Sequence, residues 1–279
     1  MNSSVAPLVP IREVDLPDVQ AELPAIALQL DEAGVSGLRY PITVHLSDGS
    51  QQATVASVAF AASVGAETRG VHMSRFVESL HVWRNRIAVS TLFALLGEIR
   101  ERLDADSAVA RFDFPLFLER TGPVSGGGAL VPYDCSLEGQ VGPSGAQCTL
   151  TTRVPVTSLC PCSREISDYG AHNQRGSVEI TVSFDLTADS EHADFSDLVE
   201  VADSAGSAPI YSLLKRSDER YITMRAYENP AFVEDMTRSV AAALSGDSRI
   251  SSGRVRVVNE ESIHSHDAYA AVAWTRKSD

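Results

Sequence analysis

Segments of alternating apolar and polar residues come in pairs along this chain, and helical spacing occurs between the pairs. Ile42, Val44 and Leu46 alternate with polar residues, as in a half-buried strand, and Asp48-Gly49 predicts a tight turn into a return strand at about 53–63. Two helices should follow. Ser74 is the expected cap of the first, whose apolar face holds Phe76, Val77 and Leu80. The second carries its apolar residues at Val89, Leu92, Leu95, Leu96, Ile99 and Leu103.

Strands at about 106–116 and 129–141, with a loop at the glycine run 126–128, are predicted to complete the first half of the chain. The same order is expected again in the second half, with strands at about 146–158, 177–187, 250–259 and 267–275. A helix is predicted at about 194–204, and a longer one is predicted to start at Asn229-Pro230 because proline suits the first helical position. No residue-level repeat accompanies this duplication, so it depends on periodicity alone.

Strands in hairpin pairs indicate an antiparallel sheet, and helices in pairs between them indicate that one face is covered. The predicted class is therefore α+β. We expect an extended N-terminal arm over residues 1–40, broken by Pro7, Pro10, Pro17 and Pro24, then a first β-β-α-α-β-β module over 41–142 and a second over 143–279. Neither a dinucleotide-binding glycine motif nor a P-loop is present, so a doubly wound nucleotide-binding fold is not expected.

Composition limits the possible partners. The 279 residues carry a net charge of −14, which disfavours a general nucleic-acid binder. No run of 18 apolar residues suggests a membrane span, and no secretory signal is visible, so we expect a cytoplasmic protein with neither membrane nor nucleic-acid partners. Residues 215–225 hold four bases and few apolar residues. They form either a solvated face or the lining of an anion site.

The segment between the strands expected at 146–158 and 177–187 concentrates reactive side chains. It contains Cys160-Pro161-Cys162 and His172, together with two acids and two arginines. A thiolate and an imidazole are good ligands for zinc and related ions, although a catalytic site needs a third ligand. Without further information, a buried thiol beside a hydrogen-bonded histidine explains the spacing equally well. Cys135 and Cys148 have no assigned role, and a reducing compartment makes disulfides unexpected.

Six blocks of sequence, in order along the chain, resemble the type IB GTP cyclohydrolase family. They cover residues 16–20, 70–76, 155–175, 213–221, 226–235 and 259–268. The block at 155–175 is long and specific. The resemblance implies the tunnelling fold, with two modules per chain and several chains, usually four, forming a barrel-like homo-oligomer. It also implies that active sites lie at subunit interfaces.

The resemblance implies one divalent metal per site, held by Cys160, His172 and Glu219. A set of sulfur, nitrogen and oxygen ligands suits zinc, manganese or iron(II), and no nucleotide cofactor is expected. On the residues alone, Glu219 could equally be a surface acid paired with Arg216 or Arg220.

The resemblance assigns further roles around this metal. Glu234 is the expected guanine anchor, since a carboxylate accepts from the ring N–H and the amine together. His264 is the expected proton carrier, with Glu261 and Cys162 as weaker catalytic candidates and His266 as a substrate contact. The triphosphate is expected to bind four cationic side chains, which are His72, Arg75, Lys215 and Arg216.

The implied activity is a GTP cyclohydrolase I reaction, in which a cyclic amidine C–N bond is hydrolysed. GTP and water give 7,8-dihydroneopterin triphosphate and formate, the first step of tetrahydrofolate biosynthesis. Two alternatives stay open: a tunnelling-fold nitrile reductase acting on a deazapurine, and a non-catalytic oligomer that binds metal or GTP. A zinc deaminase is excluded because Cys162 is followed by Ser163, Arg164 and Glu165 rather than by the spacing that enzyme needs.

Overall fold

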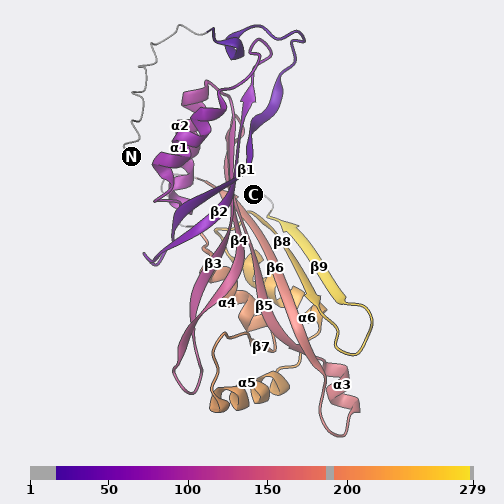
Figure 1. Cartoon of the computed structure of the whole chain (residues 1–279). Helices are drawn as coiled ribbons and strands as arrows, with labels where there is room; N and C mark the ends of the chain where they lie inside the picture. The colour runs from indigo at the N-terminus through magenta and orange to yellow at the C-terminus, as the bar shows by residue number, and fades with distance from the viewer. Residues whose placement is uncertain (1–16, 187–191, 277–279) are drawn as a thin grey trace, which may run out of the picture.

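One antiparallel sheet runs through the whole molecule and carries its helices on one face (Figure 1). The computed structural model describes residues 17–186 and 192–276. The strands are β1 (Leu30–His45), β2 (Gln51–Val64), β3 (Ala108–Thr121), β4 (Gly128–Gly142), β5 (Gly145–Leu159), β6 (Asn173–Asp185), β7 (Ala208–Pro209), β8 (Ser252–Asn259) and β9 (Ala268–Thr275). The helices are a 3-10 turn η1 (Val19–Ala21), then α1 (Met73–Trp83), α2 (Val89–Leu103), α3 (Pro161–Ile166), α4 (Phe195–Ala205), α5 (Arg216–Glu228) and α6 (Val233–Gly246).

The strand order is β1-β2-β3-β4-β5-β6-β8-β9, with the two-residue β7 paired to β5. The two predicted modules, residues 41–142 and 143–279, therefore contribute to one sheet, in which β4 pairs with β5 from Gly142↔Gly145 to Asp134↔Arg153. The structure confirms the predicted α+β class and the antiparallel pairing of the strands. In the second module, α3, β7 and α5 are additions to the simple β-β-α-α-β-β order.

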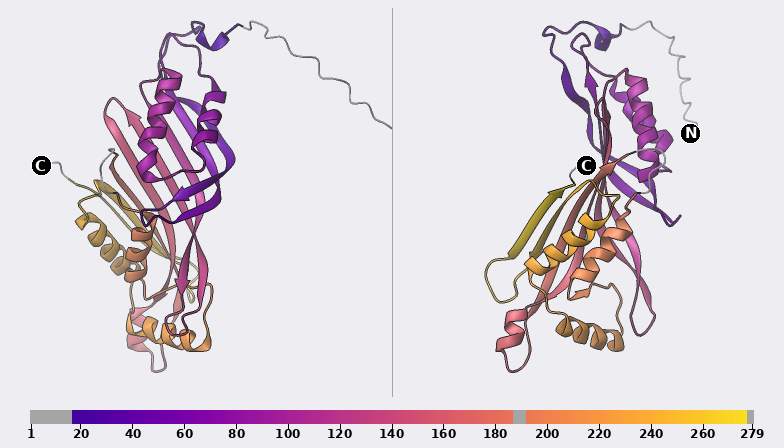
Figure 2. Two further views of the ribbon diagram at one scale, coloured as in Figure 1. Left: turned by 90° about the vertical axis from the view of Figure 1, so that its left-hand side faces the viewer. Right: turned by 180° about the vertical axis from the view of Figure 1, so that it is seen from behind.

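Alternation along the strands explains why only one face is covered. On β3, Phe112 and Phe114 point to the same side, because residues two apart share a face. Phe112 contacts Phe60 of β2 at 5.7 Å between ring centroids, and Phe60 stacks on Phe76 of α1 at 6.1 Å. Phe114 contacts Phe195 of α4, also at 5.7 Å. The helices of both modules thus pack on one continuous apolar face. Because the sheet twists, the α1–α2 pair and the α4–α6 pair face different directions in Figure 2.

The opposite face of the sheet is polar. Arg111 forms ion pairs with Asp113 and Glu138 at 3.0 and 3.5 Å, and Arg153 pairs with Glu179 at 2.8 Å. The side chains of these five residues are 34–57% exposed. None of the helices in residues 17–186 and 192–276 combines the length and apolar character needed to cross a bilayer.

Several sequence expectations need correction at element ends. Residues 30–40, assigned to the arm, belong to β1, and residues 1–16 with Pro7 and Pro10 lie outside the described residues. Helix α1 begins at Met73 with His72 at its N-cap, so Ser74 lies within the first turn and is not the cap. The strand expected at 177–187 is β6, which starts earlier and ends at Asp185, while residue 187 is outside the description.

The start predicted for the long helix at Asn229-Pro230 is wrong. Asn229 instead ends α5, where its side-chain amide donates to the Arg225 carbonyl at 2.6 Å. Helix α6 begins at Val233, and the carboxylate of Asp235 accepts from the backbone N–H of Phe232 at 3.3 Å. Helix α5 was not predicted, because its sequence shows no apolar stripe. In agreement, only Asp218 and Ala226 are buried in it.

Gly139 on β4 gives a direct test of this packing. A Cβ built there would lie 2.3 Å from Leu92 Cδ2 and 2.6 Å from Leu92 Cγ of α2. We expect Gly139→Ala to lower the free energy of unfolding by about 1–3 kcal/mol through overpacking. Urea denaturation measures this change.

Gly97→Ala is the matched control, since nothing lies within 4 Å of a Cβ at that position of α2. Alanine in a helix interior should leave stability unchanged or raise it by up to ~1 kcal/mol. Equal unfolding free energies for the two variants would contradict the packing of α2 on β4.

Candidate active site

The connection between β5 and β6 holds Cys160 and His172 next to each other. Cys160 follows the last residue of β5 and is the N-cap of α3, where its sulfur accepts from the Ser163 N–H at 3.5 Å. Pro161 occupies the first helical position, for which its fixed backbone angle is suited. The backbone N–H of Cys160 donates to the His172 carbonyl at 3.1 Å and closes the base of the loop. Cys160 is partly exposed and Cys162 is exposed.

The loop between β8 and β9 reaches the same place from about a hundred residues further along the chain. The Ser262 hydroxyl lies 3.2 Å from His172 Nδ1. Glu261 Oε2 lies 2.7 Å from His264 Nδ1, and the rings of His264 and His266 stack with centroids 5.3 Å apart. The structure therefore brings together two of the predicted segments, and with them His172, Glu261, His264 and His266.

Gln174 joins these two segments and was not identified from the sequence. Its Oε1 lies 2.9 Å from His172 Nδ1, and its Nε2 donates to Glu261 Oε1 at 3.2 Å. The residue is only 9% exposed. The available signal was its position near the start of β6, two residues after His172.

Glu234 lies close to the end of β5. Three residues before it, the Ala231 N–H donates to the Leu159 carbonyl at 3.1 Å, and the Ala231 carbonyl accepts from Ser158 Oγ at 3.2 Å. These contacts attach the start of α6 to the strand that leads into Cys160. Glu234 itself is exposed in the first turn of α6.

Glu219, the third expected metal ligand, does not join Cys160 and His172 within one chain. The far end of α5 contacts α3, where the Arg164 guanidinium lies 4.7 Å from the centre of the Tyr227 ring. Glu219 is eight residues earlier, about 12 Å along the helix axis at 1.5 Å per residue. Among the residues that the structure describes, no three His, Cys, Asp or Glu side chains are placed to hold a metal ion.

Asp218 holds the start of α5 in place against the first module. Its carboxylate accepts from the backbone N–H groups of Val124 and Ser125 at 2.8 Å each, from Ser125 Oγ at 2.6 Å and from the Lys215 N–H at 2.9 Å. The side chain is fully buried. These hydrogen bonds, that of Ser125 Oγ above all, hold the pKa of Asp218 well below its usual range. Lys215, Arg216 and Glu219 are consequently held at the tip of the β3–β4 hairpin.

His72 and Arg75, expected at the triphosphate, lie on α1 at the other end of the molecule from α3 (Figure 1). His72 Nε2 lies 3.1 Å from Asp18 Oδ2, and Arg75 donates to the Arg102 carbonyl at 2.6 Å. In one chain, the candidate residues thus form three separate groups. They are the cluster around His172, the start of α5, and the start of α1.

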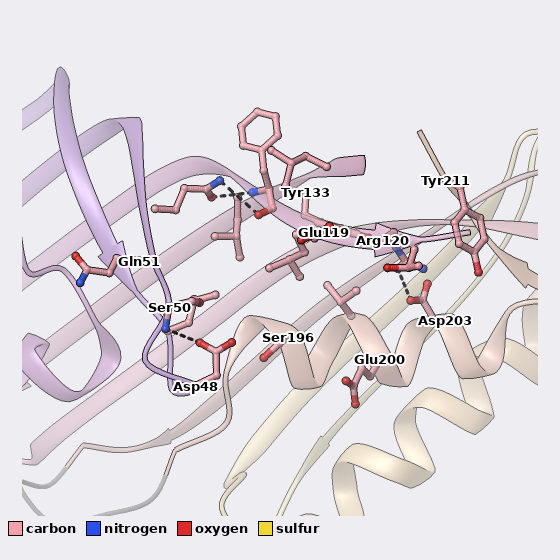
Figure 3. A pocket seen from close by; sticks show the side chains of 18 residues that line it. Asp48, Ser50, Gln51, Glu119, Arg120, Tyr133, Ser196, Glu200, Asp203 and Tyr211 are labelled. Carbon is pink, nitrogen blue, oxygen red and sulfur yellow. Dashed lines mark hydrogen bonds and ion pairs between the residues drawn. The ribbon is translucent and has the colours of Figure 1, made fainter. Parts of the chain in front are cut away.

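A hollow in the surface lies away from this cluster. It has a volume of about 840 Å³ and lies between the β1–β2 turn, the β3–β4 hairpin and α4 (Figure 3). At one end, the Arg120 guanidinium donates to Asp203 and to the Tyr133 hydroxyl, the latter at 2.6 Å. No candidate site residue lines this hollow. The cluster around His172 is open to solvent in the single chain, and its neighbours Ile166 and Ile263 are 84% and 64% exposed.

Comparison with known proteins gives a consistent result. A family model described as type I GTP cyclohydrolase folE2 matches residues 16–270. The chain is 42% identical over 255 residues to GTP cyclohydrolase FolE2 of Desulfovibrio desulfuricans, covering 91% of this chain and 96% of that protein. It is 41% identical over 266 residues to GTP cyclohydrolase FolE2 of Magnetococcus marinus, covering 95% and 98%. The resemblance found in the sequence is thereby confirmed, and the expected class is narrowed to the FolE2 type.

Solved structures support the fold. The uricase of Arthrobacter globiformis matches with a TM-score of 0.53 at 9% sequence identity, covering 89% of this chain and 94% of the uricase. A thermostable mutant of that uricase matches with a TM-score of 0.54, also at 9% identity, covering 91% and 95%. At such low identity the likeness concerns the fold alone, and it confirms the tunnelling fold.

The hydrogen bonds that Asp218 accepts from the β3–β4 hairpin give a testable prediction. Asp218→Asn keeps the size of the side chain but replaces an oxygen that accepts hydrogen bonds with an amide that donates them. We expect a lower Tm and faster hydrogen exchange at residues 122–127 and 215–220. Thermal unfolding and exchange mass spectrometry measure both.

Glu228→Gln is the matched control, because it makes the same charge change on an exposed residue of α5. Its Tm and exchange should match those of the wild type. Wild-type exchange in Asp218→Asn would show that the carboxylate does not hold α5 to the hairpin.

Proposed function

The chain belongs to the type I GTP cyclohydrolase FolE2 family, and from this premise we propose that it converts GTP and water to 7,8-dihydroneopterin triphosphate and formate. The reaction serves tetrahydrofolate biosynthesis, and we place it in the cytoplasm. The observation that carries the proposal is the cluster around His172. Its residues come from two segments far apart in the sequence, and both match the family blocks.

Cys160 and His172 are suited to hold a divalent metal. His172 Nδ1 faces the Gln174 amide oxygen, which can only accept a hydrogen bond, so Nδ1 carries the hydrogen and Nε2 keeps its lone pair. Cys160, whose backbone N–H donates to the His172 carbonyl, supplies a partly exposed sulfur. A divalent ion such as zinc, manganese or iron(II) supplies Lewis-acid activation, lowering the pKa of a water molecule towards neutrality.

The chain's own groups are suited to recognise guanine and to move protons. Glu234 presents an exposed carboxylate in the first turn of α6, which can accept from the guanine ring N–H and the exocyclic amine together. His264 Nδ1 donates to the Glu261 carboxylate, leaving the Nε2 lone pair to take up a proton and then pass it to purine N7. Protonation at N7 makes C8 a better electrophile for water. His266 stacks on His264 and is a further candidate contact, and exposed Cys162 follows in the first turn of α3.

We propose that a second subunit completes the site and supplies Glu219. Movement of α5 within one chain is opposed by the buried Asp218 carboxylate, which holds its first turn to the β3–β4 hairpin. Exposed apolar side chains around the cluster favour burial against another copy, and Tyr169 is fully exposed in the single chain. The cations on α1 and at the start of α5 would reach the triphosphate in the same way. A homotetramer with shared sites is the proposed assembly.

Turnover of GTP tests the activity. Protein stripped of metal by a chelator should form the pterin chromophore and formate only after zinc, manganese or iron(II) is added. Cys160→Ala should abolish this metal-dependent turnover, because one of three ligands is lost.

The control is Cys148→Ala, which removes a thiol buried in β5 away from the cluster and should retain turnover when folded. Metal binding without formate would instead indicate a non-catalytic binding protein. Oxidation of a nicotinamide with a nitrile substrate, without metal, would indicate the reductase.

Complementation between two inactive variants tests the shared site. When Cys160→Ala and Glu219→Ala chains are co-expressed, each can provide what the other lacks. If Glu219 comes from a neighbour, random mixing should restore about a quarter of the sites. Turnover per mole of protein measures the restored fraction.

Each variant expressed alone is the control and should be inactive. Mixed oligomers that are no more active than the single variants would contradict a site shared in this way.

A further inference from the structure

We propose that Gln174 is a positioning residue that fixes the ring of His172 and joins it to the Glu261–His264 pair. The metal ligand and the proton carrier would then be held as one hydrogen-bonded unit. The inference rests on the proposed function, because that function gives His172 and His264 their roles. Gln174 itself would contact neither metal nor substrate.

The two partners of Gln174 determine how its amide lies. Oε1 faces His172 Nδ1 at 2.9 Å and Nε2 faces Glu261 Oε1 at 3.2 Å. In the reversed orientation, the amide oxygen would face the carboxylate oxygen, with no hydrogen between two acceptors. Gln174 is only 9% exposed, so water cannot easily replace either hydrogen-bond partner. Gln174 therefore has one favourable orientation.

This orientation selects one tautomer of His172. An amide oxygen only accepts, so the imidazole hydrogen lies on Nδ1. The Ser262 hydroxyl, 3.2 Å from the same nitrogen, can accept the same hydrogen. Nε2 keeps its lone pair and is the nitrogen that can bind an ion. Groups that orient a ligating histidine in this way commonly change metal affinity 10- to 100-fold when they are removed.

The other end of Gln174 positions Glu261. The Glu261 side chain is 10% exposed, while that of His264 is 54% exposed. Glu261 Oε1 accepts from Gln174, and Oε2 accepts from His264 Nδ1 at 2.7 Å. With both oxygens engaged, the carboxylate has little freedom to rotate. His264 is thus held through its Nδ1, and its Nε2 is the ring nitrogen not used by Glu261.

The chemistry explains why an amide, rather than a carboxylate, suits position 174. A carboxylate there would accept from His172 Nδ1 equally well. However, it would face the Glu261 carboxylate at the present 3.2 Å contact, where two like charges repel. Only an amide accepts on one side and donates on the other. Gln174→Glu and Gln174→Met therefore separate the two functions of this residue.

Metal affinity and the His172 tautomer give the test. In Gln174→Met both hydrogen bonds are lost, so zinc affinity, measured by competition with a chelator, should fall 10- to 100-fold. Nitrogen-15 NMR of the metal-free protein should show His172 losing its single Nδ1–H tautomer. In Gln174→Glu the acceptor remains, so tautomer and zinc affinity should be kept, whereas kcat should fall because Glu261 and His264 are displaced.

Unchanged zinc affinity and an unchanged tautomer in Gln174→Met would overturn the inference. Wild-type kcat in Gln174→Glu would overturn the link to His264. Both zinc binding and NMR are measured without GTP, so they remain decisive even if the wild-type protein fails to turn GTP over. Absence of GTP turnover by the wild-type protein would contradict the proposed function, and not the role of Gln174. Circular dichroism of each variant confirms folding, and Gln174→Glu keeps the test decisive if Gln174→Met does not fold.

Discussion

The register of β5, β6 and β8 is the constraint on which the candidate site depends. Leu159 pairs with Asn173, and Gly176 pairs with Asn259, so the end of β5, the start of β6 and the end of β8 meet at one edge of the sheet. The two loops that leave this edge contain Cys160, His172 and His264. A shift of one residue would turn every side chain to the other face. The chemistry of the cluster therefore follows from the pairing of strands far apart in the sequence.

A buried hydroxyl strengthens this edge. The Asn259 amide donates to Ser158 Oγ at 2.7 Å, and Ser158 Oγ donates to the Ala231 carbonyl at 3.2 Å. Both Ser158 and Asn259 are buried, so these hydrogen bonds are shielded from competing water. They join β8, β5 and the segment entering α6. The start of α6, which carries Glu234, is thereby attached to the end of β5 that leads into Cys160.

Apolar periodicity was sufficient to predict most of the sheet. Pairs such as Phe112 and Phe114 show the buried face directly, and hence the antiparallel strands and the helices on one side. It was not sufficient for α5, whose first turn is fixed by hydrogen bonds to Asp218 rather than by an apolar stripe. Helix ends were also missed, because Asn229 and Pro230 suit the end of one helix as well as the start of the next.

The candidate site was predictable from sequence only as residue types in matching blocks. The structure confirms contact between the segments of His172 and His264, and it adds Gln174, a residue that no motif singled out. Within one chain, the structure does not bring Glu219, His72 or Arg75 to the cluster around His172. Their separation within one chain has a physical reason, since α5 and α1 are each fixed to other parts of the same subunit. An assembly of several chains can join these groups where one chain cannot.

The most direct measurement is a crystal structure of the zinc-loaded oligomer, with the metal located by anomalous scattering. We expect one ion bound by Cys160 Sγ and His172 Nε2 of one subunit and by the Glu219 carboxylate of its neighbour. An ion bound elsewhere, or a complete set of ligands from a single subunit, would contradict it.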